Sequence, residues 1–397
     1  MNGALDGVKV LDLTRLLPGG FCTLLLADLG ADVLKVEDPQ GGDYIRWMPP
    51  YYGGERERAN GTASAYFLAL NRNKRSVTLN LKDPSDRDRL LALGDGYDVL
   101  VESFRPGVMD RLGVGYEVLR KRNPRLVYCA ISGYGQQSPL RDRSGHDTNY
   151  LALCGLLGLT GHRDGPPIQS AGQIADLGGG GLMAAVGILA ALIERERSGE
   201  GQLVDISMTD GALSWLAMVV ARYFCERKLP RRGEIELGGG IVCYFPYETK
   251  DGRWVALGAL EPKFWQNWCE GVDRSDLKDK QFEHPESESG HEVARIFRER
   301  TRDEWAAFAG EHDCCLEPVL DLDEALDSEL FAAREMIVEL DQPGIGPVQQ
   351  VGSPIRLSRT PATTDGAAPA LGEQTDEVLG RLGDDGAPVE RVSEDVA

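Results

Sequence analysis

Short apolar runs alternate with helical patterns over the first third of the chain. Val8–Leu13 is rich in β-branched residues and is typical of a buried strand, whereas Phe21–Leu29 carries helical spacing. Gly30 ends that helix and Asp32–Glu37 begins a second strand, which completes a strand–helix–strand unit. The alternation continues with strands at 76–81, 99–102 and 126–132 and helices at 86–93 and 116–122. We therefore predict a large, Rossmann-like α/β domain with a parallel sheet.

The pattern changes in the second half of the chain. Asp176–Ile193 is an apolar helix entered through Gly178–Gly181, and a glycine run at a helix start is typical of close packing or of backbone near a ligand. A strand follows at 201–207. From about Arg231 we predict a hairpin of two strands, 242–247 and 254–259, followed by helices near 264–269 and 287–298. These elements indicate a separate, smaller α+β domain.

The first strand–helix–strand unit suggests a dinucleotide site in which Glu37 holds a ribose. That interpretation needs a G-x-G-x-x-G turn, which lets the backbone approach a pyrophosphate. The turn here runs from Arg15 to Phe21 with glycines only at Gly19 and Gly20. We therefore do not expect nicotinamide or flavin binding.

Charge and composition narrow the function further. The chain of 397 residues carries 63 acidic and 43 basic side chains, a formal charge of −20, so nucleic acid is not an expected partner. Its eight cysteines form no C-x-x-C pair, and we expect no metal site. The longest apolar run, Leu182–Ile193, is well short of the roughly 20 residues that cross a bilayer. Met1–Gly7 lacks the features of a secretory signal, so we expect a cytoplasmic protein with no membrane partner.

Three short segments hold residues that can carry proton chemistry. Ser144–Tyr150 concentrates a histidine, a carboxylate, an amide and a phenol, and it includes His146, one of only five histidines. The structural alternative is a helix start at which Asp147 stabilises the first turn. Asp176 is most simply an N-cap, and Glu261–Lys263 is most simply a turn. Taken singly, each segment leaves both interpretations open.

Taken together, these segments resemble the class III CoA-transferase (CaiB/BaiF) family, which includes the α-methylacyl-CoA racemases. The resemblance runs in order from about residue 4 to residue 383. The matching motifs are Leu5–Asp12, Ala27–Val33, Lys35–Glu37, Asn71–Ser76, Phe104–Gly107, Gly145–Asp147, Asp176–Gly180 and Gly372–Thr375. Within the family, Gly145–Leu151 and Gly258–Pro262 are most similar to the racemase branch, since transferases generally lack the histidine.

The racemase resemblance implies that His146 and Asp176 form an acid/base pair and that Glu261 orients His146. They would interconvert the 2R and 2S forms of 2-methylacyl-CoA thioesters through an enolate, without a cofactor. The resemblance also implies that the remaining site residues bind the acyl-CoA, and these are Arg72, Lys74, Arg75, Leu79, Asn80, Arg105, Arg111, Gly145, Asp147 and Tyr150.

A long segment, Tyr44–Leu70, is more similar to the transferase branch. It supports an alternative in which Asp176 is a nucleophile that moves CoA between carboxylic acids through an aspartyl-CoA intermediate.

The resemblance also implies a domain order and an assembly. Residues 1–215 begin the large domain, residues 216–335 form the small domain, and residues 336–397 return to complete the large domain and end in an acidic tail. Two chains are expected to form a homodimer of interlocked rings, with each active site between domains of the two subunits.

Overall fold

The computed structural model describes residues 3–54 and 61–382 of the chain. Residues 55–60 of the long Tyr44–Leu70 segment, and the predicted acidic tail after residue 382, lie outside the described residues. The chain divides into two compact units. The large unit comprises residues 1–154, 171–214 and 329–397, and the small unit comprises residues 155–170 and 215–328. Residues 155–170 therefore belong to the small unit, whereas the family resemblance implied that they belong to the large domain.

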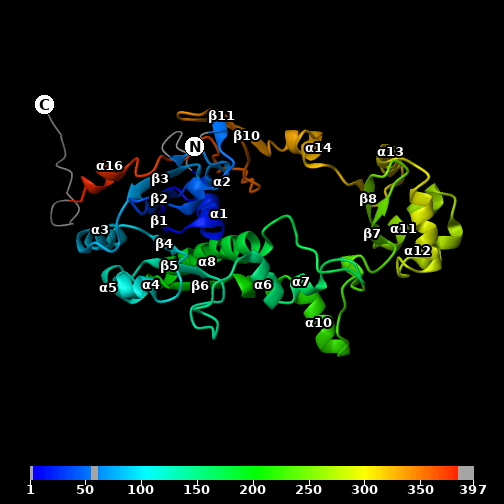
Figure 1. The fold of residues 1–397 in the computed structure, drawn as a ribbon, viewed down its shortest axis with the longest axis horizontal. Coiled ribbons are helices and arrows are strands. Elements are labelled where there is room, and N and C mark those ends of the chain that lie inside the picture. Colours follow the sequence, from blue (N-terminus) through cyan, green and yellow to red (C-terminus); the bar gives the residue numbers. More distant parts are fainter. Residues whose placement is uncertain (1–2, 55–60, 383–397) are drawn as a thin grey trace. The chain divides into compact units, whose positions relative to one another are not determined.

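A six-stranded parallel sheet in the order β3-β2-β1-β4-β5-β6 forms the centre of the large unit (Figure 1). This order and its parallel pairing are those of a doubly wound α/β fold. Leu11 at the centre of β1 pairs with Leu34 of β2 on one side and Leu100 of β4 on the other. The strands are β1 Lys9–Leu13, β2 Asp32–Glu37, β3 Lys74–Thr78, β4 Val99–Glu102, β5 Val127–Ser132 and β6 Leu203–Ser207.

Helices cover both faces of this sheet, which explains why its central strands are continuous apolar runs. On one face, Leu90 and Leu119 of two helices pack against Leu11 and Leu34. On the other face, α1, η4 and α8 pack together, and α8 contacts β5 and β6. The helices of the two faces are α1 Leu16–Asp28, α3 Pro84–Asp95, α4 Val108–Leu112, α5 Tyr116–Arg122, η4 Ile174–Leu182 and α8 Met183–Ser198.

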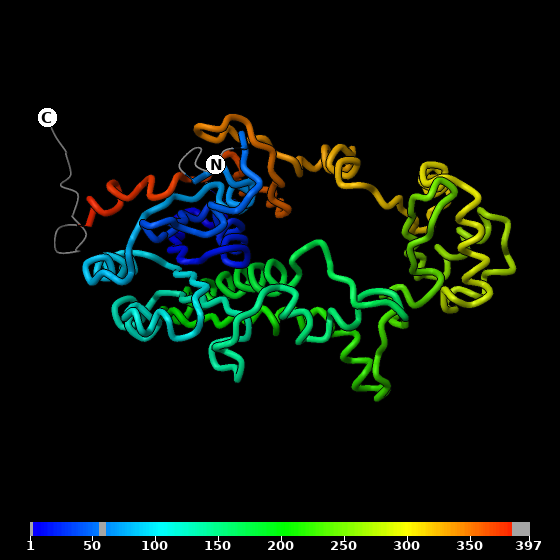
Figure 2. Tube along the Cα trace, in the orientation of Figure 1, coloured from blue at the N-terminus to red at the C-terminus, as the bar shows by residue number. Residues whose placement is uncertain are grey.

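The end of the chain returns to the large unit, where segments far apart in sequence lie together (Figure 2). It forms the antiparallel hairpin β10–β11 and then runs along β3, the edge strand of the parallel sheet. Gln374 donates its amide hydrogen to the Ser76 carbonyl at 2.9 Å, and its side-chain oxygen accepts the Ser76 amide hydrogen at 2.7 Å. The elements of this segment are α15 Glu329–Ala333, β10 Ile337–Gln342, β11 Gly346–Val351 and α16 Thr375–Leu379.

The small unit contains a three-stranded antiparallel sheet in the order β7-β8-β9, so the predicted hairpin is present. Its core includes the fully buried Trp265, Trp268 and Trp305, and the rings of the first two stack 5.0 Å apart. The elements are α7 Leu156–Leu159, α10 Ala217–Glu226, η5 Glu236–Gly238, β7 Tyr244–Glu248, β8 Trp254–Gly258, α11 Pro262–Gly271, η6 Ser275–Lys280, α12 Glu288–Phe297, α13 Arg302–His312, β9 Leu316–Pro318 and α14 Leu322–Leu326.

The apolar helix after Gln173 is longer than its sequence pattern predicted. Its helical stretch, Ile174–Ser198, has 25 residues, because it begins two residues earlier and continues through the polar residues 194–198. By length and composition alone it is long and apolar enough to cross a membrane. Half of its apolar window is buried, and a buried helix in the core of a soluble domain meets the same test.

Candidate active site

A cavity of about 320 Å³ opens at the carboxyl edge of the parallel sheet. Its lining comes from the ends of four strands: Leu13 at the end of β1, Val36 of β2, Leu79 after β3 and Phe104 after β4. The strand order reverses between β1 and β4. Open α/β sheets bind their ligands outside the carboxyl ends of the strands at this switch point. The predicted residues Leu79 and Asn80 both line the cavity, together with Lys82.

Arg15, which sequence analysis did not single out, stands at the mouth of this cavity. Its guanidinium lies 5.0 Å from the ring centre of Tyr44 and 5.6 Å from that of Phe104. Its backbone amide donates to Ser103 Oγ at 3.0 Å, which ties the end of β1 to the end of β4. Arg15, Asp38 and Tyr44 also line an adjoining cavity of about 580 Å³. The sequence signal that could have identified Arg15 was its position, because it lies two residues after β1, the strand at the switch point.

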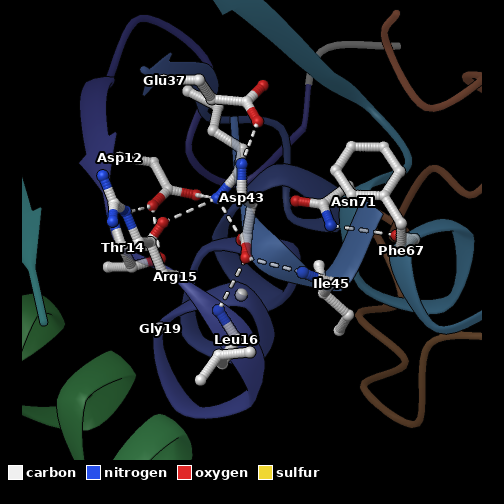
Figure 3. A network of polar contacts seen from close by, with 12 residues as sticks. Asp12, Thr14, Arg15, Leu16, Gly19, Glu37, Asp43, Ile45, Phe67 and Asn71 are labelled. Carbon is white, nitrogen blue, oxygen red and sulfur yellow. Dashed lines mark hydrogen bonds and ion pairs between the residues drawn. The ribbon is translucent and has the colours of Figure 1, made fainter. Parts of the chain in front are cut away.

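A buried polar network fixes the loop that carries Arg15 (Figure 3). Asp43 Oδ1 accepts the Leu16 amide hydrogen at 3.0 Å, and Lys35 Nζ lies 3.1 Å from Asp43 Oδ2. Lys35 also donates to the Thr14 carbonyl at 2.9 Å, and the Thr14 hydroxyl donates to Asp12 Oδ1 at 2.6 Å. These contacts hold Leu16 in the left-handed region, at a φ of 62°, which few residues of its shape adopt.

Two of the predicted phosphate-binding cations are internal, and the prediction for them is wrong. Arg72 is 2% exposed and pairs with Asp28 at 2.6 Å. Lys74 is 4% exposed and lies 3.3 Å from Asp12 Oδ2. Both cations stabilise the interior of the large unit, so neither faces a bound anion.

The other predicted cations lie at the surface. Arg75 is partly exposed and pairs with Asp32 at 2.7 Å. Arg105 and Arg111 are exposed on the segment that follows β4. These two side chains are therefore accessible to an anionic ligand near the cavity.

The predicted proton-transfer residues His146 and Asp176 are brought together by Asp147. His146 is the N-cap of α6, Asp147–Leu153, and its side chain is exposed. The buried Asp147 follows it, and Asp147 Oδ1 accepts the backbone amide hydrogens of Ala175 at 2.7 Å and of Asp176 at 2.9 Å. One carboxylate therefore joins the start of α6 to the start of η4.

Asp176 is not the N-cap that its sequence position suggested. It lies in the first turn of the π-helix η4, whose N-cap is Gln173, and it is 8% exposed. Burial raises the pKa of its carboxyl group to about 6, and the nearby charge of Asp147 acts in the same direction while that of His146 opposes it. A carboxyl group with this pKa both accepts and donates protons near neutral pH.

Gly145 and Tyr150 pack together beside His146. The Tyr150 hydroxyl donates to the Gly145 carbonyl at 2.6 Å, and the Tyr150 ring meets Tyr134 edge-to-face at 5.3 Å. A Cβ on Gly145 would lie 2.7 Å from the Tyr134 hydroxyl, so only glycine fits there. These contacts give the segment before α6 a single backbone path.

The glycines of η4 allow close packing, as predicted. A Cβ on Gly179 would lie 2.8 Å from the Met208 carbonyl of α9, Met208–Ser214, and one on Gly181 would lie 2.6 Å from the Pro18 carbonyl of α1. The absence of side chains there lets both neighbouring helices approach the turn that holds Asp176.

Glu261 lies in the small unit. It is the N-cap of α11, it precedes Pro262, and its side chain is exposed. The predicted contact with His146, which belongs to the large unit, stays a prediction.

The model of the family described as CoA-transferase family III matches residues 5–375 of the chain. The chain belongs to this family. It is 39% identical over 404 residues to the succinyl-CoA:mesaconate CoA-transferase of Haloarcula marismortui, covering 96% of this chain and 97% of that protein. It is 34% identical over 383 residues to the alpha-methylacyl-CoA racemase of Homo sapiens, covering 96% of this chain and 94% of that protein.

Solved structures of family members share the fold. A CaiB/BaiF family protein from Brucella suis is similar with a TM-score of 0.82 and 29% identity, covering 96% of this chain and 99% of that one. Transferases and racemases therefore both stand among the relatives of the chain.

Proposed function

We propose that the protein is an acyl-CoA racemase or epimerase that removes and returns the α-proton of 2-methylacyl-CoA thioesters. The observation that carries the proposal is the link through Asp147, which holds His146 and the buried Asp176 at adjoining helix starts. Inversion at an α-carbon needs one base on each face, each with a pKa near the operating pH. An imidazole and a carboxyl group with a pKa of about 6 are matched to that task.

We place the nucleotide end of CoA in the cavity at the carboxyl edge of the sheet. Its wall offers apolar surface from Leu13, Leu79 and Phe104, which suits the flat face of adenine. Arg15 and Lys82 supply positive charge at the same wall, and a protein of net charge −20 needs such local cations for phosphates. The reaction itself requires no metal or redox cofactor.

The assembly belongs to the same proposal. An interlocked homodimer, as the family resemblance implies, would bring the partner subunit's Glu261 to His146 and so orient the imidazole. We expect the enzyme to work in the cytoplasm on soluble acyl-CoA.

The test is isotope exchange in D₂O with a chiral 2-methylacyl-CoA. We expect deuterium at the α-carbon together with loss of optical purity. Absence of exchange with a series of such thioesters would count against the proposal.

A second candidate is CoA transfer between carboxylic acids, and it is favoured by the 39% identity to a protein named as a CoA-transferase. In that reaction Asp176 attacks the thioester carbonyl and expels the CoA thiolate, which leaves a mixed anhydride. The thiolate then attacks the aspartyl carbonyl, which releases the donor acid and leaves an aspartyl-CoA thioester. Hydroxylamine during turnover would modify Asp176 in this case, and an unmodified Asp176 would exclude it.

A further inference from the structure

The side chain of Asp147, at the start of α6, forms its hydrogen bonds with a different helix, η4. It is 2% exposed, and its Oδ1 accepts two amide hydrogens from residues 28 and 29 positions later. The first amides of a helix have no partner within their own helix. The N-cap of η4, Gln173, forms no side-chain capping bond. Asp147 therefore caps the helix that carries Asp176 from a different helix.

The other oxygen of the same carboxylate is not satisfied. Asp147 Oδ2 is buried and has no hydrogen-bond partner among the described residues. Leaving a buried acceptor unpaired is costly, so such an atom calls for an explanation. The two amide bonds already secure the backbone through Oδ1. Oδ2 therefore takes no part in anchoring η4, and the carboxylate, whose negative charge is shared by both oxygens, has no hydrogen-bond donor on that side among the described residues.

The groups around Asp176 show where that charge acts. From α6, Asp147, His146 and Tyr150 are the titratable groups that interact with Asp176 in the described part of the chain. Of the elements packed on η4, α1 presents Pro18 and α9 presents Met208, and the Asp210 carboxylate of α9 is not among the groups that shift the pKa of Asp176. Asp147 is therefore the source of negative charge beside the Asp176 carboxyl group.

We propose that Asp147 is a positioning residue for Asp176: one carboxylate oxygen anchors the Asp176 backbone, and the negative charge of the carboxylate stabilises the protonated Asp176 side chain. The inference rests on the proposed function, because the proton that Asp176 carries is then the α-proton of the substrate. Burial is the main reason that Asp176 holds this proton, and the two charges at the start of α6 adjust it in opposite directions, since Asp147 strengthens the hold and His146 weakens it.

The test measures the Asp176 carboxyl directly and needs no turnover, so it stands even if the proposed reaction is wrong. The full-length protein is labelled with carbon-13 at the aspartate side chains, and the Asp176 signal is assigned by its loss in Asp176→Asn. Its titration midpoint should be about 6 in the wild type. In Asp147→Asn, which keeps an oxygen for the two amides but removes the charge, the midpoint should fall by about one pH unit or more.

Two control variants distinguish the loss of the Asp147 charge from a general disruption of the structure. Asp98→Asn removes a carboxylate that likewise accepts a backbone amide hydrogen, from Lys9 at 2.9 Å, at the opposite edge of the sheet, and should leave the midpoint unchanged. His146→Gln should raise the midpoint, because it removes the opposing influence. If Asp147→Asn does not fold, Asp147→Ser is the second neutral variant. An unchanged midpoint in the neutral Asp147 variant, or an equal fall in Asp98→Asn, overturns the proposal.

Discussion

The guanidinium of Arg15 donates a hydrogen bond to the Tyr44 hydroxyl at 2.9 Å, at the rim that two neighbouring cavities share. We predict that Arg15→Gln weakens CoA binding roughly 10-fold or more, because a hydrogen bond to a charged group contributes about 1.5–3 kcal/mol. Calorimetry with free CoA measures this effect. Arg120→Gln is the control, since Arg120 pairs with Glu117 on the surface of α5 and should bind CoA normally. Equal affinities in both variants would remove Arg15 from the binding site.

His146→Ala and Asp176→Ala should each slow racemisation by about 10²–10⁴-fold, which is the usual contribution of a positioned acid or base. The remaining base should still exchange the α-proton of one enantiomer. The two variants should therefore prefer opposite enantiomers in D₂O, while CoA affinity is retained. If both variants exchange both enantiomers equally, these residues are not the two bases. Under the transferase alternative, Asp176→Ala abolishes turnover and His146→Ala only weakens substrate binding.

The buried Asp12 should stabilise the large unit in a pH-dependent way. Burial by itself would raise its pKa, but the charges of Lys35 and Lys74 hold the pKa at about 2, below its ordinary value of 3.8. Because the folded state binds this proton more weakly than the unfolded state, the stabilisation is complete above about pH 4 and is lost as the pH falls toward 2. Asp12→Asn should lower Tm clearly at pH 7 and much less at pH 3. A Tm difference that is the same at both pH values would contradict this.

Gly211→Ala should destabilise the packing of α9 on η4. An added Cβ would lie 2.1 Å from the Gly179 carbonyl oxygen, and backbone must move to relieve the contact. Overpacking of this kind typically costs about 1–3 kcal/mol, so we expect Tm to fall by roughly 2–10 °C. Gly20→Ala is the matched control in the same unit, because its Cβ meets only Leu70 at 3.5 Å. The control should melt close to the wild type in scanning calorimetry.

The parallel sheet was predictable from sequence because strands buried on both faces are rich in apolar residues, and β1, β4 and β5 have this form. The edge strand β3, Lys74–Thr78, contains Val77 as its one apolar residue. The carboxylates that pair with the buried cations were not predictable from sequence. Arg72 and Lys74 stand in a basic motif that suggests a surface, and their carboxylates lie 44 and 62 residues away. Only the fold reveals that these cations point inward.

In the candidate site, too, the contacts between residues far apart in sequence could not be predicted. Local pattern marked His146 and Asp176 as polar residues at helix starts, and the family resemblance paired them. Neither indicated that Asp147 caps the helix of Asp176, since that bond spans 29 residues. Arg15 was missed because a single arginine after a strand has no periodic signal, and its importance comes from the strand order.

The segment around Gln374 covers the edge strand β3, and this has a consequence for how the protein is made. Gln374 is synthesised 298 residues after Ser76, so the edge of the sheet stays open during most of translation. An open strand edge pairs readily with other chains. We therefore expect nascent chains that end before Gly372 to aggregate or to need a chaperone on the ribosome, although every strand of the sheet is already present in them. Emergence of the segment around Gln374 from the ribosome is the step that covers the edge of the sheet and protects it from edge-to-edge aggregation.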